Sequence, residues 1–557
     1  MHRELKRLAD ERFDVAIIGG GVYGLCTAWA CALRGLTVGL IERGDFGAAT
    51  SAGSLKLVHG GLRYLQHLDF ARMRLSIQER RNFLRMAPHL VHPLPFLIPC
   101  YGHALKGPEA MRLALCLNDL IAWDRNCGIP DPARQIPRSR MITAQECLRV
   151  LPGVDKKSLT GAAIFYDGQM YSSERLSLAF ALSAAQAGAA LANYAEAVRF
   201  VVRGPRIAAV AVRDVLSGTE FDLRAEVFIN MTGPWADITV ARLHGPEPSR
   251  TVRRSKGIQL IVRPKLCDMA FGVESRRERD KTARIRRGNR SYFATPWRNV
   301  TMIGTTDTLF VGDPDSFGVT ETEIEEFLAA FNEAYPAARL KRSDVLFWCG
   351  GLRPLGDIDA DPDHVQAAHH PEVVDHAHQG GPENLLTVVG VKYTVVRALA
   401  ERAAQWVTDR VGRGAREPQT SHARLVGGNV DDLDAVARLV EKNLGVPSEV
   451  ARHLARMYGT EVQQLFALTR NQPNLRSPIA GHPEVLRAQV AHACRAEAAQ
   501  CLSDVVFRRT ELGATGDPGP QALEECAELM AQELGWDSSR RRSELERVRA
   551  AFVPSKP

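Results

Sequence analysis

This chain of 557 residues lacks the features of membrane spans, disulfide frameworks and zinc sites. No apolar run reaches the roughly 18 residues that a spanning helix requires. Its eleven cysteines have no CxxC spacing, which favours buried thiols in a reducing compartment. The apolar stretch near the N-terminus follows charged residues and is broken by glycines, so we do not expect a signal peptide. These absences lead us to expect a soluble, cytoplasmic protein without a bound metal.

The chain also has little excess charge, with a formal net charge of +7. A nucleic-acid partner is not expected, because neither interleaved aromatic residues nor a recognition module accompanies the basic residues. We favour a solvated loop or hairpin for the densest basic cluster, and leave contact with anionic lipid open, assisted by the first ten residues. The cluster consists of Arg276, Arg277, Arg279, Lys281, Arg284, Arg286, Arg287 and Arg290.

Composition is that of an ordinary globular protein, with 45% hydrophobic and 24% charged residues. Up to about residue 411, strand-like runs alternate with helical stretches and turn signals. A mostly polar segment, 412–421, contains two glycines and one proline and is typical of a linker. Beyond it the spacing of apolar residues predicts helices, including a long one from Glu484 to about Phe507.

The clearest motif is a dinucleotide-binding unit between Phe13 and Glu42. An apolar run leads into Gly19, Gly21 and Gly24, and a helical stretch and a second apolar run follow. The first glycine permits a tight strand-to-helix turn, the second lets the backbone approach a pyrophosphate, and the third allows close packing of the helix on the strand. The helix N-terminus attracts phosphates, and Glu42 is placed to accept hydrogen bonds from ribose hydroxyls.

Further motifs identify a family. The stretch from Ser51 to Leu65 reads Ser-Ala-Gly-Ser-Leu-Lys-Leu-Val-His-Gly-Gly-Leu-Arg-Tyr-Leu. It resembles the flavin-dependent glycerol-3-phosphate dehydrogenases, which have a similar Ser-rich lead into Lys-Leu-Ile-His-Gly-Gly-Leu-Arg-Tyr-Leu. The resemblance covers most of the chain, and it continues through Met86–Leu90, Asn230–Trp235, Ile303–Asp307, Gly351–Leu355, Gly390–Thr394 and Phe507–Thr510.

The resemblance implies an α/β fold with three parts. A Rossmann-like FAD-binding domain is interleaved with an antiparallel-sheet substrate domain over residues 1–411, and a C-terminal all-α cap domain follows a linker at 412–424. The FAD parts are expected at about 12–75, 160–240 and 345–411, the substrate parts mainly at 76–159 and 250–344, and the cap at 425–557.

The resemblance also implies FAD as the cofactor. In a cofactor site, small residues and hydroxyls let the backbone lie against a flat ring and a pyrophosphate. The residues expected to contact FAD are Gly19, Gly21, Gly24, Glu42, Thr50, Ser51, Ser54, Lys56, His59, Thr232, Gly233 and Lys392.

The cations of three separate motifs point to an anion site, and the resemblance implies a phosphorylated polyol as its ligand. A phosphate dianion removed from water needs at least two positive partners, and the arginine fork suits it best. Arg63, Arg353 and Lys392 match the substrate-contacting segments of the family. The implied reaction transfers a hydride from the carbon of a secondary alcohol to the flavin and gives a ketone, here dihydroxyacetone phosphate from glycerol 3-phosphate.

Two departures from the family pattern bear on the catalytic residues. Where the family often has Lys-Gly-Ser-His, this chain has Lys256-Gly257-Ile258-Gln259, and a glutamine cannot take a proton near neutral pH. We assign catalytic roles to His59, Arg353 and Gln259, with His59 as the candidate base or, equally, a buried structural histidine. The family often has consecutive aspartates where this chain has Ser172-Ser173-Glu174, which leaves the exact substrate open.

Two alternatives stay open. One is an FAD-dependent amine or amino-acid oxidase of the same superfamily, with an arginine holding a carboxylate. The other is a flavin-binding sensor that has lost turnover. For the leading interpretation, the family implies that electrons pass to a membrane quinone or sometimes to dioxygen. A peripheral position on the cytoplasmic face of the inner membrane is then expected, and a homodimer is compatible with it.

Overall fold

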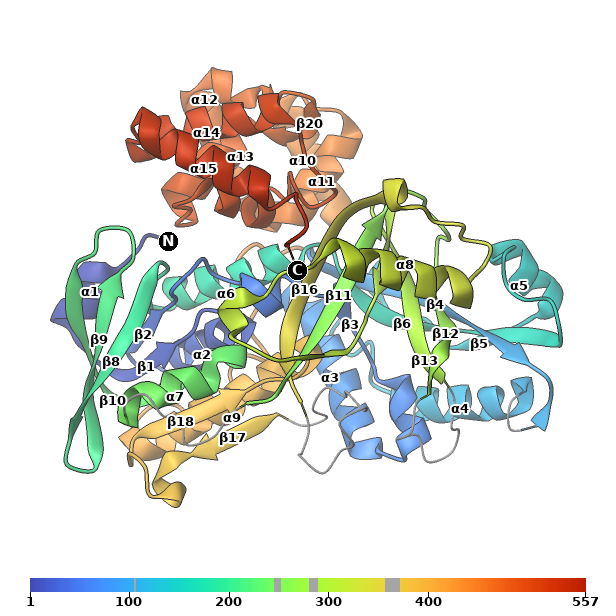
Figure 1. Cartoon of the computed structure of the whole chain (residues 1–557), viewed down its shortest axis with the longest axis horizontal. Helices are drawn as coiled ribbons and strands as arrows, with labels where there is room; N and C mark the ends of the chain where they lie inside the picture. The colour runs from blue at the N-terminus through green and yellow to red at the C-terminus, as the bar shows by residue number, and fades with distance from the viewer. Residues whose placement is uncertain (105–106, 245–251, 280–288, 356–370, 557) are drawn as a thin grey trace.

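The computed structural model describes residues 1–104, 107–244, 252–279, 289–355 and 371–556. Two large sheets lie side by side, and a C-terminal group of helices packs across them as a third layer (Figure 1). Residues 280–288, which include Lys281, Arg284, Arg286 and Arg287 of the predicted basic cluster, lie outside the described residues, as do the cluster's other side chains. Within the described ranges, no helix is long and apolar enough to cross a bilayer.

The first sheet has eight strands and a parallel centre. Its order is β17-β18-β10-β1-β2-β7, and the β8–β9 hairpin pairs with β10. The bounds are β1 Arg12–Ile18, β2 Val38–Ile41, β7 Ala190–Ala192, β8 Ala195–Arg203, β9 Arg206–Asp214, β10 Glu220–Asn230, β17 Glu372–Asp375 and β18 Leu385–Val389.

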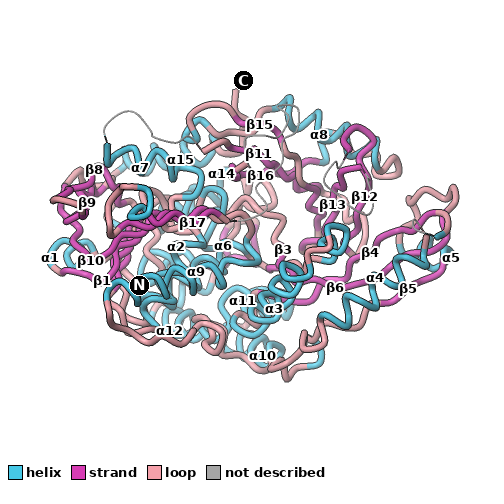
Figure 2. Tube along the Cα trace, turned by 90° about the horizontal axis from the view of Figure 1, so that it is seen from below, coloured by secondary structure: helices cyan, strands magenta, loops and turns pink. Residues whose placement is uncertain are grey.

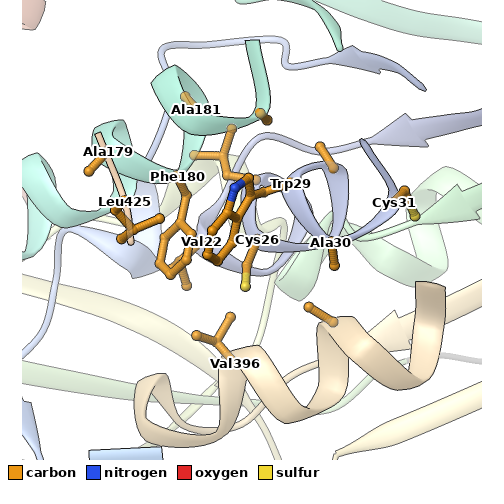
Figure 3. Packing of buried hydrophobic residues seen from close by; sticks show 14 of the residues in the cluster. Val22, Cys26, Trp29, Ala30, Cys31, Ala179, Phe180, Ala181, Val396 and Leu425 are labelled. Carbon is orange, nitrogen blue, oxygen red and sulfur yellow. The ribbon is translucent and has the colours of Figure 1, made fainter. Parts of the chain in front are cut away.

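Helices α2 (Val22–Leu33), α6 (Ser173–Gln186) and α9 (Val396–Val411) cover one face of this sheet. Figure 3 shows Trp29 of α2 against Phe180 of α6, with ring centroids 5.8 Å apart. The buried strands read as almost continuous apolar runs, as strands do when both faces of a parallel sheet are covered. This rigid packing fixes the loops at the carboxyl ends of β1 and β2, where the cofactor unit was predicted.

The second sheet has ten strands and is mostly antiparallel. Its order is β15-β11-β14-β13-β12-β4-β6-β3, with β16 paired to β11 and β5 paired to β6. The bounds are β3 Leu57–Val58, β4 Val91–Tyr101, β5 Arg140–Thr143, β6 Leu159–Met170, β11 Arg254–Val262, β12 Ala270–Arg279, β13 Asn289–Trp297, β14 Val300–Gly304, β15 Thr308–Phe310 and β16 Val345–Pro354. Helices around it are α3 Phe70–Met86, α4 Pro108–Ile121, α5 Ala144–Val150 and α8 Glu321–Ala334, and the short helices α1 Leu5–Asp10 and α7 Ala236–His244 pack on the first sheet.

The C-terminal part begins its helices at Leu433. Between α13 and α14 the chain forms a π-helical turn, Asp504–Arg509, and a two-stranded β19–β20 hairpin interrupts the helices. The bounds are α10 Leu433–Leu444, α11 Ser448–Tyr458, α12 Val462–Asn471, β19 Pro478–Ile479, β20 His482–Leu486, α13 Arg487–Ala496, α14 Pro520–Leu534 and α15 Ser538–Ala550. Figure 2 shows, from below, helices α2, α6 and α9 between the strands of the first sheet, on the left, and those of the second sheet, on the right.

The structure differs from the predicted boundaries in several places. Strands β3, β6 and β16 belong to the second sheet, although 12–75, 160–240 and 345–411 were assigned to the FAD part. The C-terminal part is helical, as predicted, apart from the two-stranded β19–β20 hairpin. The single helix predicted from Glu484 to Phe507 is a strand, a helix ending at Ala496 and a separate π-helical turn.

Candidate functional site

One cavity of about 1940 Å³ opens where the two sheets meet. Its walls come from the glycine turn after β1, from the loop that follows β2, from β11 and β16, and from the segment after β18. Thirteen of the fifteen residues predicted for the site line it: Gly19, Gly21, Glu42, Thr50, Ser51, Ser54, His59, Arg63, Thr232, Gly233, Gln259, Arg353 and Lys392. Their roles toward ligands stay predictions.

The glycine turn has the close contacts that a dinucleotide site needs. Gly19 has φ +108°, and a Cβ there would lie 2.6 Å from the carbonyl oxygen of Met231. A Cβ on Gly24 would overlap the carbonyl oxygen of Gly19, so this glycine lets α2 pack against the turn, as predicted. Gly21 is the N-cap of α2 and faces the cavity. The turn therefore presents bare backbone and a helix N-terminus to the cavity.

Glu42 is placed at the end of β2 beside this turn. Its carboxylate accepts hydrogen bonds from the backbone N–H of Gly20 at 2.6 Å and of Gly44 at 2.8 Å. Burial raises the pKa of Glu42, and these two hydrogen bonds partly offset the shift. A carboxylate fixed by backbone donors at the cavity wall keeps free lone pairs for ribose hydroxyls.

Short hydroxyl side chains join the loop after β2 to its surroundings. Ser51 Oγ accepts a hydrogen bond from the backbone N–H of Val22 at 3.0 Å, and Thr50 Oγ1 donates to the carbonyl of Leu352 at 2.9 Å. Across the cavity, Thr232 Oγ1 donates to Asn230 Oδ1 at 2.7 Å. These contacts place the loop and the turn that follows β10 on either side of the cavity.

Lys56 departs from the prediction of a cofactor contact. Its ammonium group is buried away from the cavity lining, 2.5 Å from Glu174 and 3.6 Å from Glu511, and it donates to Ser173 Oγ at 3.2 Å. A buried lysine needs carboxylate partners, and this one has them. Ser173 and Glu174 stand where the family often has consecutive aspartates. In this chain these two residues bind Lys56 in a buried ion-pair network behind the cavity.

Three cations, Arg63, Arg353 and Lys392, line the cavity, and a fourth, Arg72, lies close to Lys392. Lys392 Nζ donates to the hydroxyl of Tyr64 at 2.7 Å. Burial lowers the pKa of Lys392 to about 8, and the charges of Arg72, Arg63 and Arg353 contribute to that shift. Such mutual repulsion is what a site prepared for a multiply charged anion produces. Sequence reasoning had found three of these cations.

Arg72 is the residue that the sequence analysis missed. It lies in the first turn of α3, where it pairs with Asp69 at 2.9 Å and stacks over the ring of Tyr64 at 5.1 Å. No motif marks it, because its position depends on how α3 packs against the segment that follows β3. The Leu-Arg-Tyr-Leu motif nearby, which contains Tyr64, was the available signal.

The register of β11 against β16 places Arg353. Gly257 pairs with Gly351, and Ser255 pairs with Arg353. A Cβ on Gly257 would lie 2.8 Å from a guanidinium nitrogen of Arg353, so the glycine makes room for this side chain. Arg353 also donates to Asp307 at 2.7 Å, which fixes the direction of the guanidinium group.

Gln259 lies on β11, two residues after Gly257, and lines the cavity. Its Nε2 donates to Thr305 Oγ1 at 3.2 Å, and its Oε1 accepts a weak hydrogen bond from the thiol of Cys349 at 3.5 Å. The amide is therefore held in position, and it can orient a hydroxyl group without accepting its proton.

His59 lines the cavity beside Tyr64, with ring centroids 5.9 Å apart, and its backbone N–H donates to Thr394 Oγ1 at 3.2 Å. Burial lowers the pKa of His59 to about 3, and the charges of Lys392 and Arg80 lower it further. The imidazole is neutral at physiological pH, which is the form that can accept a proton.

Within the described residues, no group of three His, Cys, Asp or Glu side chains could hold a metal ion.

Family models match almost the whole chain. Residues 14–406 match the model described as FAD dependent oxidoreductase, and residues 418–541 match the C-terminal domain of alpha-glycerophosphate oxidase. The glycerol-3-phosphate dehydrogenase of Synechocystis sp. is 33% identical over 545 residues, with 96% of this chain and 95% of that protein covered. The mitochondrial glycerol-3-phosphate dehydrogenase of Bos taurus is 32% identical, with 96% and 72% covered.

Solved structures show the same fold. The glycerol-3-phosphate dehydrogenase from Bacillus halodurans, complexed with FAD, superposes with a TM-score of 0.76 at 24% identity, covering 98% of this chain and 95% of that one. L-alpha-glycerophosphate oxidase from Mycoplasma pneumoniae has a TM-score of 0.51 at 17% identity, covering 74% and 98%. The predicted fold class, an FAD domain with a second sheet and a C-terminal domain, is confirmed.

The cavity fits FAD by its own features. Its volume, the backbone turn at Gly19 that leaves no room for a side chain, and the fixed carboxylate of Glu42 are those of a dinucleotide site. Together with the family models and the relatives, they show that this chain belongs to the FAD-dependent glycerol-3-phosphate dehydrogenase family.

Proposed function

We propose that this chain oxidises glycerol 3-phosphate, or a closely related polyol phosphate, at its secondary alcohol to the corresponding ketone, which is dihydroxyacetone phosphate for glycerol 3-phosphate. The observation that carries the proposal is a group of cations at the cavity that begins with the dinucleotide turn. Arg63, Arg353 and Lys392 line this cavity, and Arg72 stacks on the ring of Tyr64, close to Lys392. With the carboxylates of Asp69 and Asp307 counted, the group keeps an excess of positive charge, which suits a phosphate dianion better than a single carboxylate. This favours a phosphorylated polyol over the amino acid of the alternative oxidase.

The chain's own residues bind both ligands. The glycine turn, Glu42, Ser51 and Thr232 hold the cofactor, and FAD when bound supplies the acceptor for the substrate's hydride. Arg353 and Lys392 hold the phosphate, which leaves the polyol end to extend toward Gln259 and His59. A substrate held at both ends is oriented for reaction, and such orientation can supply several kcal/mol of the catalytic effect.

The hydroxyl proton passes to His59 in this proposal. In the protein without substrate, burial and, after it, the positive charge of Lys392 lower the pKa of the imidazole. A bound phosphate dianion offsets that charge and raises the proton affinity of His59 when the substrate is in place. Gln259 orients the hydroxyl group through its fixed amide.

We further propose that the electrons pass to a membrane quinone and that the chain lies on an anionic membrane surface. Helix α4 exposes Leu113, Cys116 and Leu120, and the exposed Trp123, just after the helix, extends this apolar stripe. Met111 and Ala114, on the opposite side of α4, line the cavity. Arg112 is exposed beside the stripe, and Arg74 approaches Trp123 to 5.8 Å. Apolar side chains flanked by arginines suit the headgroup region of an anionic bilayer.

Vesicle flotation tests this surface. Leu120→Glu should reduce binding to vesicles containing anionic lipid, whereas Leu439→Glu, at an exposed apolar position of α10, should not. Equal binding of both variants would contradict the membrane contact. Sedimentation of the same variants tests the predicted homodimer, because dissociation caused only by Leu120→Glu would assign the stripe to a second copy.

A dye-linked rate assay tests the substrate. We expect turnover with glycerol 3-phosphate and far less with glycerol, because glycerol lacks the group that the four cations bind. Peroxide formation with an amino acid, and none with glycerol 3-phosphate, would replace this function with that of an amino-acid oxidase.

A further inference from the structure

The C-terminal domain reaches the cofactor side of the first sheet through two buried arginines. Arg509 binds the carboxylate of Asp45 with two parallel hydrogen bonds of 2.6 and 2.8 Å, and Arg508 Nε binds it at 2.5 Å. The side chains of Arg509 and Asp45 are both 1% exposed. A bidentate pair fixes direction as well as distance.

Asp45 is strongly held as an anion by these partners. Burial opposes its ionisation, but the charges of Arg509 and Arg508 outweigh burial and lower its pKa. Asn193 Nδ2 donates a further hydrogen bond at 3.0 Å. Removing one partner of such a buried group leaves charge uncompensated and displaces the segment that carries it.

That segment is part of the cofactor cavity. Asp45 lies three residues after Glu42, and both residues line the cavity. Two hydrogen bonds, one on each side of Asp45, attach the segment to the glycine turn. The Glu42 carboxylate accepts from the N–H of Gly20, and the N–H of Gly47 donates to the carbonyl of Gly20 at 2.9 Å. Arg508 and Arg509 therefore bind a segment of the cavity wall, and the position of this segment also determines where Glu42 lies.

We propose that Arg508 and Arg509 are positioning residues for FAD, through which the C-terminal domain holds segment 42–48 in its cofactor-binding conformation. The inference rests on FAD as the cofactor and does not depend on the substrate. Coupling between two sites is reciprocal, so bound FAD also strengthens the attachment of the C-terminal domain.

Equilibrium FAD binding to the full-length apoprotein tests the first half. Arg509→Gln and the milder Arg508→Gln should each raise the FAD dissociation constant by roughly 5-fold to 150-fold, the usual range for coupled sites. The matched control is Arg298→Gln. Arg298 follows β13 of the second sheet and pairs with Glu511 of the C-terminal domain, so this variant also breaks an ion pair with that domain. Arg298 is 18% exposed and Arg508 13%, and the control should leave FAD binding unchanged. Equal weakening in all three variants, or in none, would overturn the inference.

Hydrogen exchange of the wild-type protein tests the reciprocal half without any substitution. FAD should slow exchange of the amides in the π-helical turn 504–509. Unchanged exchange there despite FAD binding would overturn the inference. A wild-type protein that fails to bind FAD would instead refute the cofactor assignment, and this inference with it.

Discussion

The ammonium group of Lys392 donates a hydrogen bond of 2.7 Å to the hydroxyl of Tyr64, and it also lies 4.7 Å from the centre of the Tyr64 ring. Arg72 stacks on the same ring at 5.1 Å. One aromatic side chain therefore separates two cations that repel each other. This arrangement concentrates positive charge at the cavity, and carboxylates hold two of its cations in place, Asp69 for Arg72 and Asp307 for Arg353.

The pH dependence of substrate capture should report Lys392. Its pKa is lowered to about 8, so the charge is present below pH 8 and is lost as the pH rises through that value. We expect kcat/KM, which reports ionisations of the free enzyme, to fall above pH 8 by up to about tenfold per pH unit. In Lys392→Arg the charge persists, and the alkaline decline should move to higher pH. A decline at the same pH in that variant would assign it to another group.

Removal of the Arg353 guanidinium should weaken phosphate recognition. Hydrogen bonds to charged groups contribute about 1.5–3 kcal/mol, so Arg353→Ala should lower kcat/KM for glycerol 3-phosphate by roughly 10-fold to 100-fold. Arg342→Ala is the matched control, because Arg342 pairs with Glu321 in the same sheet domain and lies outside the cavity lining. Equal losses in the two variants would mean that Arg353 acts only through folding.

Substitution of Gly24 should abolish cofactor binding. A Cβ there overlaps the carbonyl oxygen of Gly19, and neither backbone can move without opening the turn. We expect purified Gly24→Ala to contain little FAD, measured by the ratio of flavin to protein absorbance. Gly272→Ala is the control, because its Cβ would meet its nearest neighbour at an ordinary 3.4 Å. Full flavin content in Gly24→Ala would contradict the role of this turn.

Stability toward acid should depend on His453. Burial lowers its pKa to about 3, so between about pH 6.5 and 3 the unfolded chain binds a proton that the folded chain does not. Stability is therefore lost as the pH falls below about 6.5, by up to ~1.4 kcal/mol per pH unit for this one residue. His453→Gln should show a shallower decline in the free energy of unfolding, and a decline as steep as that of wild type would contradict this role.

Local motifs were predictable from the sequence, whereas contacts made by tertiary packing were not. The turn from Gly19 to Gly24 could be recognised because each glycine meets a steric limit within one βαβ unit. Arg72 could not, because its place beside Lys392 depends on the packing of α3. Lys56 lies in a cofactor-like motif, but its carboxylate partners come from α6 and the C-terminal domain. Their distance in sequence conceals that the side chain faces away from the cavity.

The prediction of a single helix from Glu484 to Phe507 was wrong for a related reason. Apolar spacing continues through this stretch, but the chain leaves the helix after Ala496. There Glu497 pairs with Arg175 at 2.7 Å, and Asp504 caps the N–H groups of Gln500 and Cys501. Helical periodicity cannot show that a buried ion pair with another domain ends the helix.

Anaerobic mixing of the FAD-loaded protein with glycerol 3-phosphate tests the central claim most directly. We predict that the oxidised flavin absorbance is lost on mixing, that one equivalent of dihydroxyacetone phosphate forms per flavin, and that glycerol at the same concentration has little effect. Flavin absorbance that stays unchanged with glycerol 3-phosphate, or that is lost only with an amine, would contradict the account.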